Sequence, residues 1–245
     1  MSQQNSNIQQ DLLKKVGGNF EYKMIILNLF SNLHYEISAN KSNNIISQNI
    51  SNEGQTFVEQ LLIDNKLLSK SFGFELGKYI PKMKSKISIG YDFNNRLNDI
   101  LINNNLKSVK SIQNGLNLKF NSNYFTWLTL DYNFNYFNSK REAINVNKFI
   151  SNLKVLFYFF ENHSFGIYKD DYVYSFDKQN FKNQFIDLSY QYTFKKSKID
   201  LDFKWSNVLN IKSYEEVILN DYSTTSNVFT IRPSQILMSV KFNFK

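Results

Sequence analysis

The feature that most constrains this chain is an alternation of apolar and polar residues, clearest in YFTWLTLDYNFNYF, residues 124–137. Apolar or aromatic side chains stand at positions 124, 128, 130, 132, 134 and 136, with Thr, Asp and Asn between the later ones. Successive side chains of a β-strand point to opposite faces, so this period predicts a strand with one apolar and one polar face. A strand of this length spans roughly 46 Å, whereas a soluble strand usually spans about 17–20 Å. An unusual environment has to account for the difference.

The same alternation recurs along the chain and predicts an all-β fold of about ten long strands, from near Phe20 to Phe244. The other clear stretches are residues 33–37, 72–76, 87–93, 116–120, 153–159, 186–194, 199–205 and 236–244. The longest apolar run is only VLFYFF, Val155 to Phe160. A transmembrane helix needs about 18–20 apolar residues, so the sequence excludes one.

The connections between these stretches alternate in length. Short ones are predicted near residues 81–83, 121–123, 161–163 and 195–196, and long polar ones near 40–54, 95–108, 139–148, 177–182 and 210–227. Strict alternation predicts an up-and-down meander with all short turns at one end of the sheet. Bacterial outer-membrane barrels have short periplasmic turns, long external loops and alternating strands of about ten residues. We therefore expect a transmembrane antiparallel β-barrel in a bacterial outer membrane, with the apolar face toward lipid.

Composition bounds the alternatives. The 245 residues include no cysteine, which excludes disulfides, thiolate metal sites and cysteine nucleophiles. A soluble β-sandwich also uses alternating strands, but these strands are long, and the chain has only 8 Gly and 2 Pro. The net charge of +8 would suit a nucleic acid, but the lysines are scattered and no nucleic-acid-binding motif is present. We expect no nucleic-acid partner.

The last stretch, FTIRPSQILMSVKFNFK, resembles the closing strand of TonB-dependent outer-membrane receptors and the related outer-membrane β-barrel family. In that family an Arg-Pro pair precedes an alternating strand that ends in an aromatic residue. Here the pair is Arg232 and Pro233, the closing aromatics are Phe242 and Phe244, and Lys245 follows. Upstream, IDLDFKWSNVLNIKSYEEV is similar to the family's penultimate strand, with its motif at residues 207–210 and Tyr214.

The resemblance covers about the last fifty residues and implies a larger assembly. Such receptors have a barrel of about 22 strands, closed by an N-terminal plug that couples to TonB. This chain has neither a recognisable plug nor a TonB box, so the resemblance implies a C-terminal barrel portion, with a flanking segment at residues 1–17 and the barrel segment at 18–245. Its implied partners are outer-membrane lipid, the missing strands and plug of the same receptor, TonB through that plug, and the barrel-assembly machinery through the last strand.

The first fifteen residues lack the basic and apolar regions of a secretory signal. We expect that a leader is missing, that the chain is not exported, or that it is a piece of something longer.

Motifs for catalysis or cofactor binding are missing from the sequence: GxSxG, HExxH, Walker and GxGxxG patterns do not occur. His34 is expected on the polar face with no acidic partner beyond Glu36, and His163 in a short turn at the opposite end from the long loops. An omptin-type protease, which is a ten-stranded barrel with an acidic and histidine centre near its loops, is therefore not expected. We predict no enzyme, no cofactor and no metal, and assign no binding residue. Polar-face lysines are expected either to favour anionic solutes in a lumen or to be solvated without a role; they include Lys86, Lys119, Lys204 and Lys241.

Three functions follow from these patterns. The first is the C-terminal barrel part of a TonB-dependent receptor that takes up a siderophore, metal chelate or glycan. The second is a free-standing small outer-membrane barrel with a structural, adhesive or passive pore role, in which the first and last strands would pair. The third is a soluble β-rich binding protein.

Overall fold

The computed structural model describes residues 10–51, 56–142, 144–176, 179–219 and 224–242. This part of the chain is all-β, apart from a single-turn 3-10 helix, η1 (Pro81–Met83). The strands of the main meander are β1 (Asp11–Met24), β2 (Leu29–Ser42), β5 (Asn65–Ile80), β6 (Ser85–Ile102), β7 (Asn105–Ser122), β8 (Leu128–Arg141), β9 (Ile144–Phe159), β10 (His163–Phe176), β11 (Gln179–Phe194), β12 (Ile199–Ser206) and β15 (Gln235–Phe242). Two inserted hairpins hold the others: β3 (Ile45–Ile50), β4 (Thr56–Leu61), β13 (Ser213–Leu219) and β14 (Thr224–Thr230).

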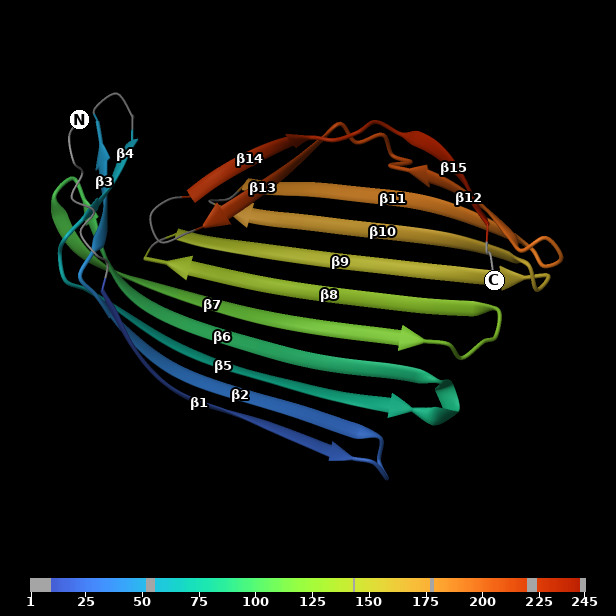
Figure 1. Ribbon diagram of the computed structural model, residues 1–245, viewed down its shortest axis with the longest axis horizontal. Helices are drawn as coiled ribbons and strands as arrows, with labels where there is room; N and C mark the ends of the chain where they lie inside the picture. The colour runs from blue at the N-terminus through green and yellow to red at the C-terminus, as the bar shows by residue number, and fades with distance from the viewer. Residues whose placement is uncertain (1–9, 52–55, 143, 177–178, 220–223, 243–245) are drawn as a thin grey trace.

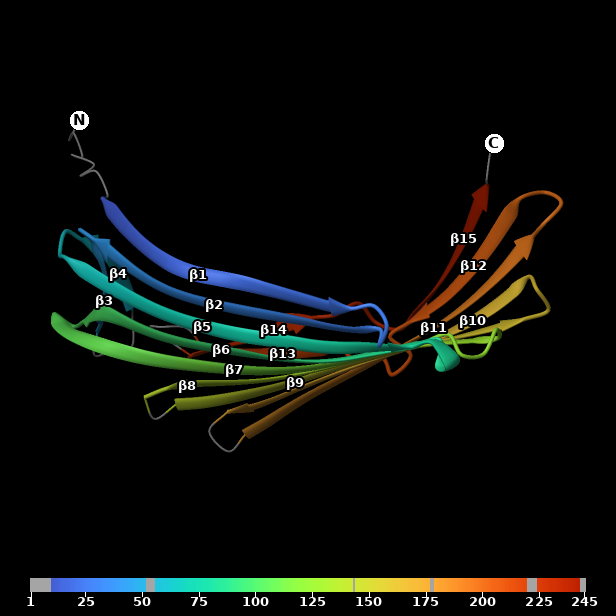
Figure 2. The same ribbon diagram turned by 90° about the horizontal axis from the view of Figure 1, so that it is seen from below.

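The meander is an antiparallel up-and-down sheet in the order β1-β2-β5-β6-β7-β8-β9-β10-β11-β12-β15 (Figure 1). The β3–β4 hairpin joins it through a short parallel pairing of Ser47 and Gln48 with the end of β6, which makes thirteen strands in all. In the described residues no pairing links β1 with β15, so the sheet is open. Figure 2 shows it bent and twisted into a trough with β1 and β15 at its free edges. The expected all-β meander is confirmed; closure into a barrel is not observed.

The two ends of the sheet are built differently. At one end, on the right in Figure 1, neighbouring strands are joined by the short segments 25–28, 81–84, 123–127, 160–162 and 195–198. At the other end lie both inserted hairpins. The predicted short connections do lie at one end of the sheet, but the predicted alternation with long loops is wrong at three of five places. Residues 95–108, 139–148 and 177–182 mostly extend their strands, so that β6 and β7 reach 18 residues each.

An irregular order of apolar and polar residues explains this error. Between β6 and β7 the turn is Asn103-Asn104, both with positive φ (47° and 60°). Asn tolerates the left-handed conformation that a tight two-residue hairpin turn requires. The strand ends beside the turn mix the apolar run at residues 100–102 and Leu106 with Asn, Asp, Lys and Ser, so their apolar residues show no clear period of two. A segment with a broken pattern is here a pair of strand ends.

Two further strand positions differ from the predictions. The fourteen-residue strand expected at 124–137 is observed at Leu128–Arg141, because the amide of Leu128 donates to the carbonyl of Phe125 (3.3 Å) in the preceding turn. At the N-terminal side, β1 begins at Asp11, so it crosses the expected boundary between residues 17 and 18. The closing residues Phe244 and Lys245 lie outside the described residues.

Crowding on the concave face, which faces the viewer in Figure 1, explains several glycines. A Cβ at Gly77 would lie 2.1 Å from the ring of Phe30, and one at Gly73 would lie 2.0 Å from the ring of His34. Glycine lets a neighbouring side chain lie flat across the strand. Gly18, on the opposite face, has nothing within 4 Å of that position.

Within the described residues, no helix combines the length and the hydropathy that a membrane-spanning helix requires.

Candidate functional site

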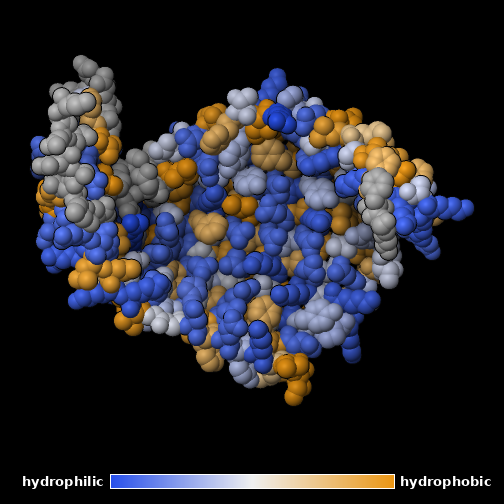
Figure 3. Space-filling model, in the orientation of Figure 1, coloured by the Kyte–Doolittle hydropathy of each residue, from blue (hydrophilic) through white to orange (hydrophobic). Residues whose placement is uncertain are grey.

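The register of the strands places most polar side chains of the alternating stretches on the concave face. One cross-strand row on this face runs Lys119, Asn133, Asn152 and Asp170 over β7, β8, β9 and β10. The next runs Asn121, Asp131, Lys154 and Tyr168 over the same strands. Figure 3 shows hydrophilic side chains across the middle of this face.

The convex face carries an apolar band that covers only part of each long strand. On β8 it runs from Leu128 to Tyr136, and on β11 from Ile186 to Phe194. Many of its members are substantially exposed, for example Ile87 at 48% and Leu76 at 43%. In the described part of the chain no second sheet covers it, because the other sheet is the two-stranded β13–β14 hairpin, which packs on the concave side.

On β8 and β11 the convex face becomes polar beyond the band, toward the hairpin end, whereas β5 and β6 carry the exposed Leu68 and Leu97 there. β8 continues with Asn138 and Lys140, and β11 begins with Asn180, Lys182 and Gln184 on this face. The apolar part is thus about nine residues, or roughly 30 Å along a strand. With a strand tilt of about 40° this becomes roughly 23 Å of height, close to the band of about 25 Å in outer-membrane barrels.

Aromatic rings collect where the band meets the short turns. Trp127 stacks on Phe125 and on Phe157, with ring centroids 5.2 and 6.4 Å apart. His163 is the first residue of β10, and its Nδ1 lies 2.6 Å from the hydroxyl of Tyr190 while its ring stacks on Phe159. His163 therefore belongs to this aromatic group. The sequence predicted the correct end of the sheet, away from the hairpins, but placed His163 in the turn instead of at the start of β10.

The β13–β14 hairpin covers part of the concave face and forms a small buried core there. Its Val217 packs with Val146 of β9 and with the fully buried Tyr174 of β10. Tyr214 makes edge contacts with Tyr172 and Tyr174. Figure 1 shows the hairpin beside β10 and β11 at the hairpin end of the sheet.

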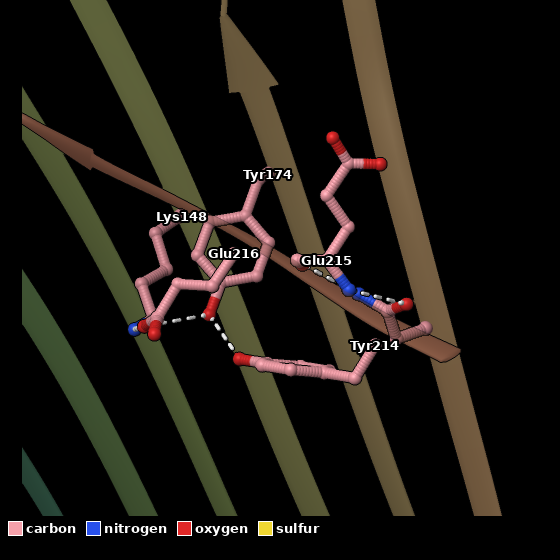
Figure 4. Close-up of polar contacts among 6 residues, drawn as sticks. Lys148, Tyr174, Tyr214, Glu215 and Glu216 are labelled. Atoms are coloured by element: carbon pink, nitrogen blue, oxygen red, sulfur yellow. Dashed lines mark hydrogen bonds and ion pairs between the residues drawn. The ribbon is translucent and has the colours of Figure 1, made fainter. Parts of the chain in front are cut away.

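A series of polar contacts fixes the β13–β14 hairpin to strands β9 and β10 (Figure 4). The hydroxyls of Tyr214 and Tyr174 are 2.6 Å apart, and Tyr174 donates to Glu216 Oε1 at 3.3 Å. Lys148 Nζ of β9 approaches the same carboxylate oxygen at 3.2 Å. Because Tyr174 donates to Glu216, Tyr214 is the donor to Tyr174. Burial raises the pKa of Tyr214, and this donated bond raises it further.

Two asparagines hold the hairpin backbone. The Asn183 side chain of β11 donates to the carbonyl of Glu215 (3.0 Å) and accepts from its amide (3.4 Å), so it acts like the edge of a strand. The buried Asn207 side chain donates to the carbonyls of Ile211 (2.8 Å) and Arg232 (3.0 Å), at the two ends of the insertion. The sequence analysis placed Asn207 in a motif, but it did not predict that Asn183 and Asn207 anchor the hairpin.

Among the hollows of the concave face, two lie over its middle strands. The central hollow, about 490 Å³, is lined by residues that include Lys86, Lys119, Asp131, Lys154 and Asp170. The second hollow, about 520 Å³, is lined by residues that include His34, Asp92, Phe137 and Lys148.

The structure shows the contacts of the polar-face residues that the sequence singled out. His34 lies across Gly73 with its Nε2 3.8 Å from Asp92 Oδ1, so the expectation that it has no acidic neighbour beyond Glu36 is wrong. The reason is that Asp92 is two strands away in the sheet and 58 positions away in the chain. Lys204 and Lys241 form ion pairs with Asp187 (3.0 Å) and Asp202 (2.6 Å). Within the described residues no three His, Cys, Asp or Glu side chains gather as a metal would require.

Comparison with known proteins gives no family: no family model matches the sequence, and no curated protein matches it.

Proposed function

We propose that this chain is the C-terminal part of the transmembrane β-barrel of a TonB-dependent outer-membrane receptor, which takes up a scarce nutrient. The observation that carries the proposal is the apolar band on the convex face. On β8 and β11 it is limited to the part of the strand that a bilayer would cover, and polar strand ends extend beyond it. Exposed apolar patches of this size mark contact with a membrane or a partner.

The free edges support a barrel larger than this sheet. Unpaired backbone groups cost several kcal/mol each in hydrocarbon, so β1 and β15 need partners there. The meander has eleven strands, so β1 and β15 run in the same direction. A barrel of these strands alone would need a parallel seam, whereas bacterial single-chain barrels have even strand numbers. An odd number of further strands restores an antiparallel seam on both sides.

This parity disfavours the free-standing small barrel and suits the receptor. In a barrel of about 22 strands, the remaining strands number eleven by subtraction, which is odd. The strand after Arg232 and Pro233 is β15, as the resemblance to the receptor family implies. Lipid would contact the convex face, the missing strands would pair with β1 and β15, and TonB would act through a plug. The assembly machinery would bind the last strand.

Cell fractionation and an uptake assay test the proposal. We expect the chain in the outer-membrane fraction after an alkaline carbonate wash. Uptake of its nutrient should fall when the chain is deleted or when the inner-membrane proton gradient is collapsed. Recovery of the chain in the soluble fraction would overturn the membrane assignment. Recovery in the outer membrane with no deletion-sensitive, gradient-dependent uptake would overturn the receptor and retain only the barrel.

A further inference from the structure

The central hollow on the concave face has a balanced charge within a basic chain. Six of its lining residues are charged, three of each sign, whereas the whole chain carries +8. These residues are Lys86, Lys119, Lys154, Glu75, Asp131 and Asp170. The hollow therefore offers no net attraction to an anion or to a cation.

The positive and negative groups of the hollow do not neutralise one another directly. Among the described residues, none of its three lysines forms an ion pair, whereas the concave-face lysines Lys148 and Lys204 do. Lys86 lies over the ring of Phe30 at 4.6 Å and Lys154 over that of Tyr168 at 5.9 Å. Their ammonium groups keep free N–H donors, because each ammonium has three.

Amide side chains hold the two aspartates in fixed positions. Asn152 Nδ2 donates to Asp170 at 2.6 Å, and Asn121 Nδ2 donates to Asp131. An ionised carboxylate accepts about four hydrogen bonds, so each aspartate retains acceptor sites toward the hollow. Charged donors and acceptors thus alternate from β7 to β10, in a sequence of lysine, aspartate, lysine and aspartate.

We propose that the central hollow binds a neutral, polyhydroxylated ligand, an oligosaccharide, on its way along the concave face. Hydroxyl groups both donate and accept, so they match separate ammonium donors and carboxylate acceptors without needing net charge. An anionic metal chelate would instead be favoured by an excess of cations. This inference rests on the proposed function, since only a barrel makes the concave face a channel. It replaces the expectation that the polar-face lysines favour anionic solutes.

Direct binding tests the inference on the protein purified in detergent micelles together with any strands that pair with β1 and β15. The probes are neutral gluco-, galacto-, manno- and xylo-oligosaccharides, with ferric citrate and an oligogalacturonate as charged comparators. At least one neutral probe should bind, with an affinity that added salt leaves unchanged, because screening affects only charged ligands. Lys119→Gln should weaken that binding by about tenfold or more, as expected for a hydrogen bond to a charged group.

Lys70→Gln is the matched control, because it removes the same charge from the convex face of β5 and should leave binding unchanged. The inference is overturned if no neutral probe binds, if a charged comparator binds more tightly than every neutral probe, or if Lys119→Gln has no effect. Because binding is measured in detergent, its outcome is separate from that of the fractionation and uptake assays. A chain that binds a neutral oligosaccharide but is recovered as a soluble protein would retain the hollow and overturn only the receptor.

Discussion

The two faces of the same strands obey opposite rules. On β6 the convex side chains Ile87 and Ile89 are exposed and apolar, while Ser88 and Asp92 point to the polar concave face. A water-soluble sheet protein would reverse this arrangement or cover the apolar face with a second layer. Here the described second layer, the β13–β14 hairpin, packs on the polar face. The difference teaches that the apolar side of this sheet is its convex side, which no described second layer covers.

The strongest way to break the comparison is to place a charge in the apolar band. Ile89→Arg on β6 is expected to lower the free energy of unfolding in lipid by about 2–4 kcal/mol, the cost of Arg near the bilayer midplane. Asn95→Arg is the matched control, since it lies on the same face of the same strand beyond the band and should cost about 0–1 kcal/mol. Equal costs in denaturant titrations of the refolded variants would contradict a lipid-facing band.

Removing a hairpin anchor tests the concave face. Asn183→Ala leaves the backbone amide and carbonyl of Glu215 without their partners, which is expected to cost about 1–3 kcal/mol. Hydrogen exchange of residues 214–217 should accelerate, while the wall strands keep their protection. Lys182→Ala alters the neighbouring convex residue on β11 and should change neither the stability nor the exchange of residues 214–217. Unchanged exchange in the Asn183 variant would show that the hairpin is held by other contacts.

Glycine substitutions sharpen the contrast in crowding. Gly77→Ala places a methyl group against the ring of Phe30 and should lower stability by about 1 kcal/mol, since the ring can turn aside. Gly18→Ala on the convex face meets open space and should be neutral or stabilising by about 0.5 kcal/mol. Thermal unfolding in detergent measures both. The reverse order would refute the assignment of the crowded face.

The smallest expected effect is a pH dependence of hairpin docking. Because the pKa of Tyr214 is raised in the folded chain, folding favours its protonated form. Its stabilising contribution is therefore complete below the ordinary tyrosine pKa of about 10 and is lost as the pH rises through the higher folded value. A spectroscopic titration should detect this, and Tyr174→Phe should lower the pKa of Tyr214 by removing its acceptor. A Tyr214 that titrates like free tyrosine would contradict the docked geometry.

Most strands of the meander could be predicted from the sequence, because a period-2 pattern such as residues 186–194 depends only on the residues of one strand. The strand ends beside Asn103-Asn104 could not, since the apolar run at residues 100–102 interrupts the period of two. The contacts of the site depend on neighbours that only pairing brings together. His34 meets Asp92 across Gly73, and Asn183 matters only once the backbone of Glu215 lies against it.

The most direct test of the central claim uses spin labels at single cysteines introduced one at a time at residues 87–93 of β6. The chain has no cysteine of its own, so each label reports one position. In reconstituted bilayers, labels at 87, 89, 91 and 93 are expected to be accessible to oxygen, which concentrates in lipid, and those at 88, 90 and 92 to a water-soluble nickel chelate. Loss of this alternation, or immobile labels at the odd positions that neither reagent reaches, would contradict an outer apolar face in contact with lipid.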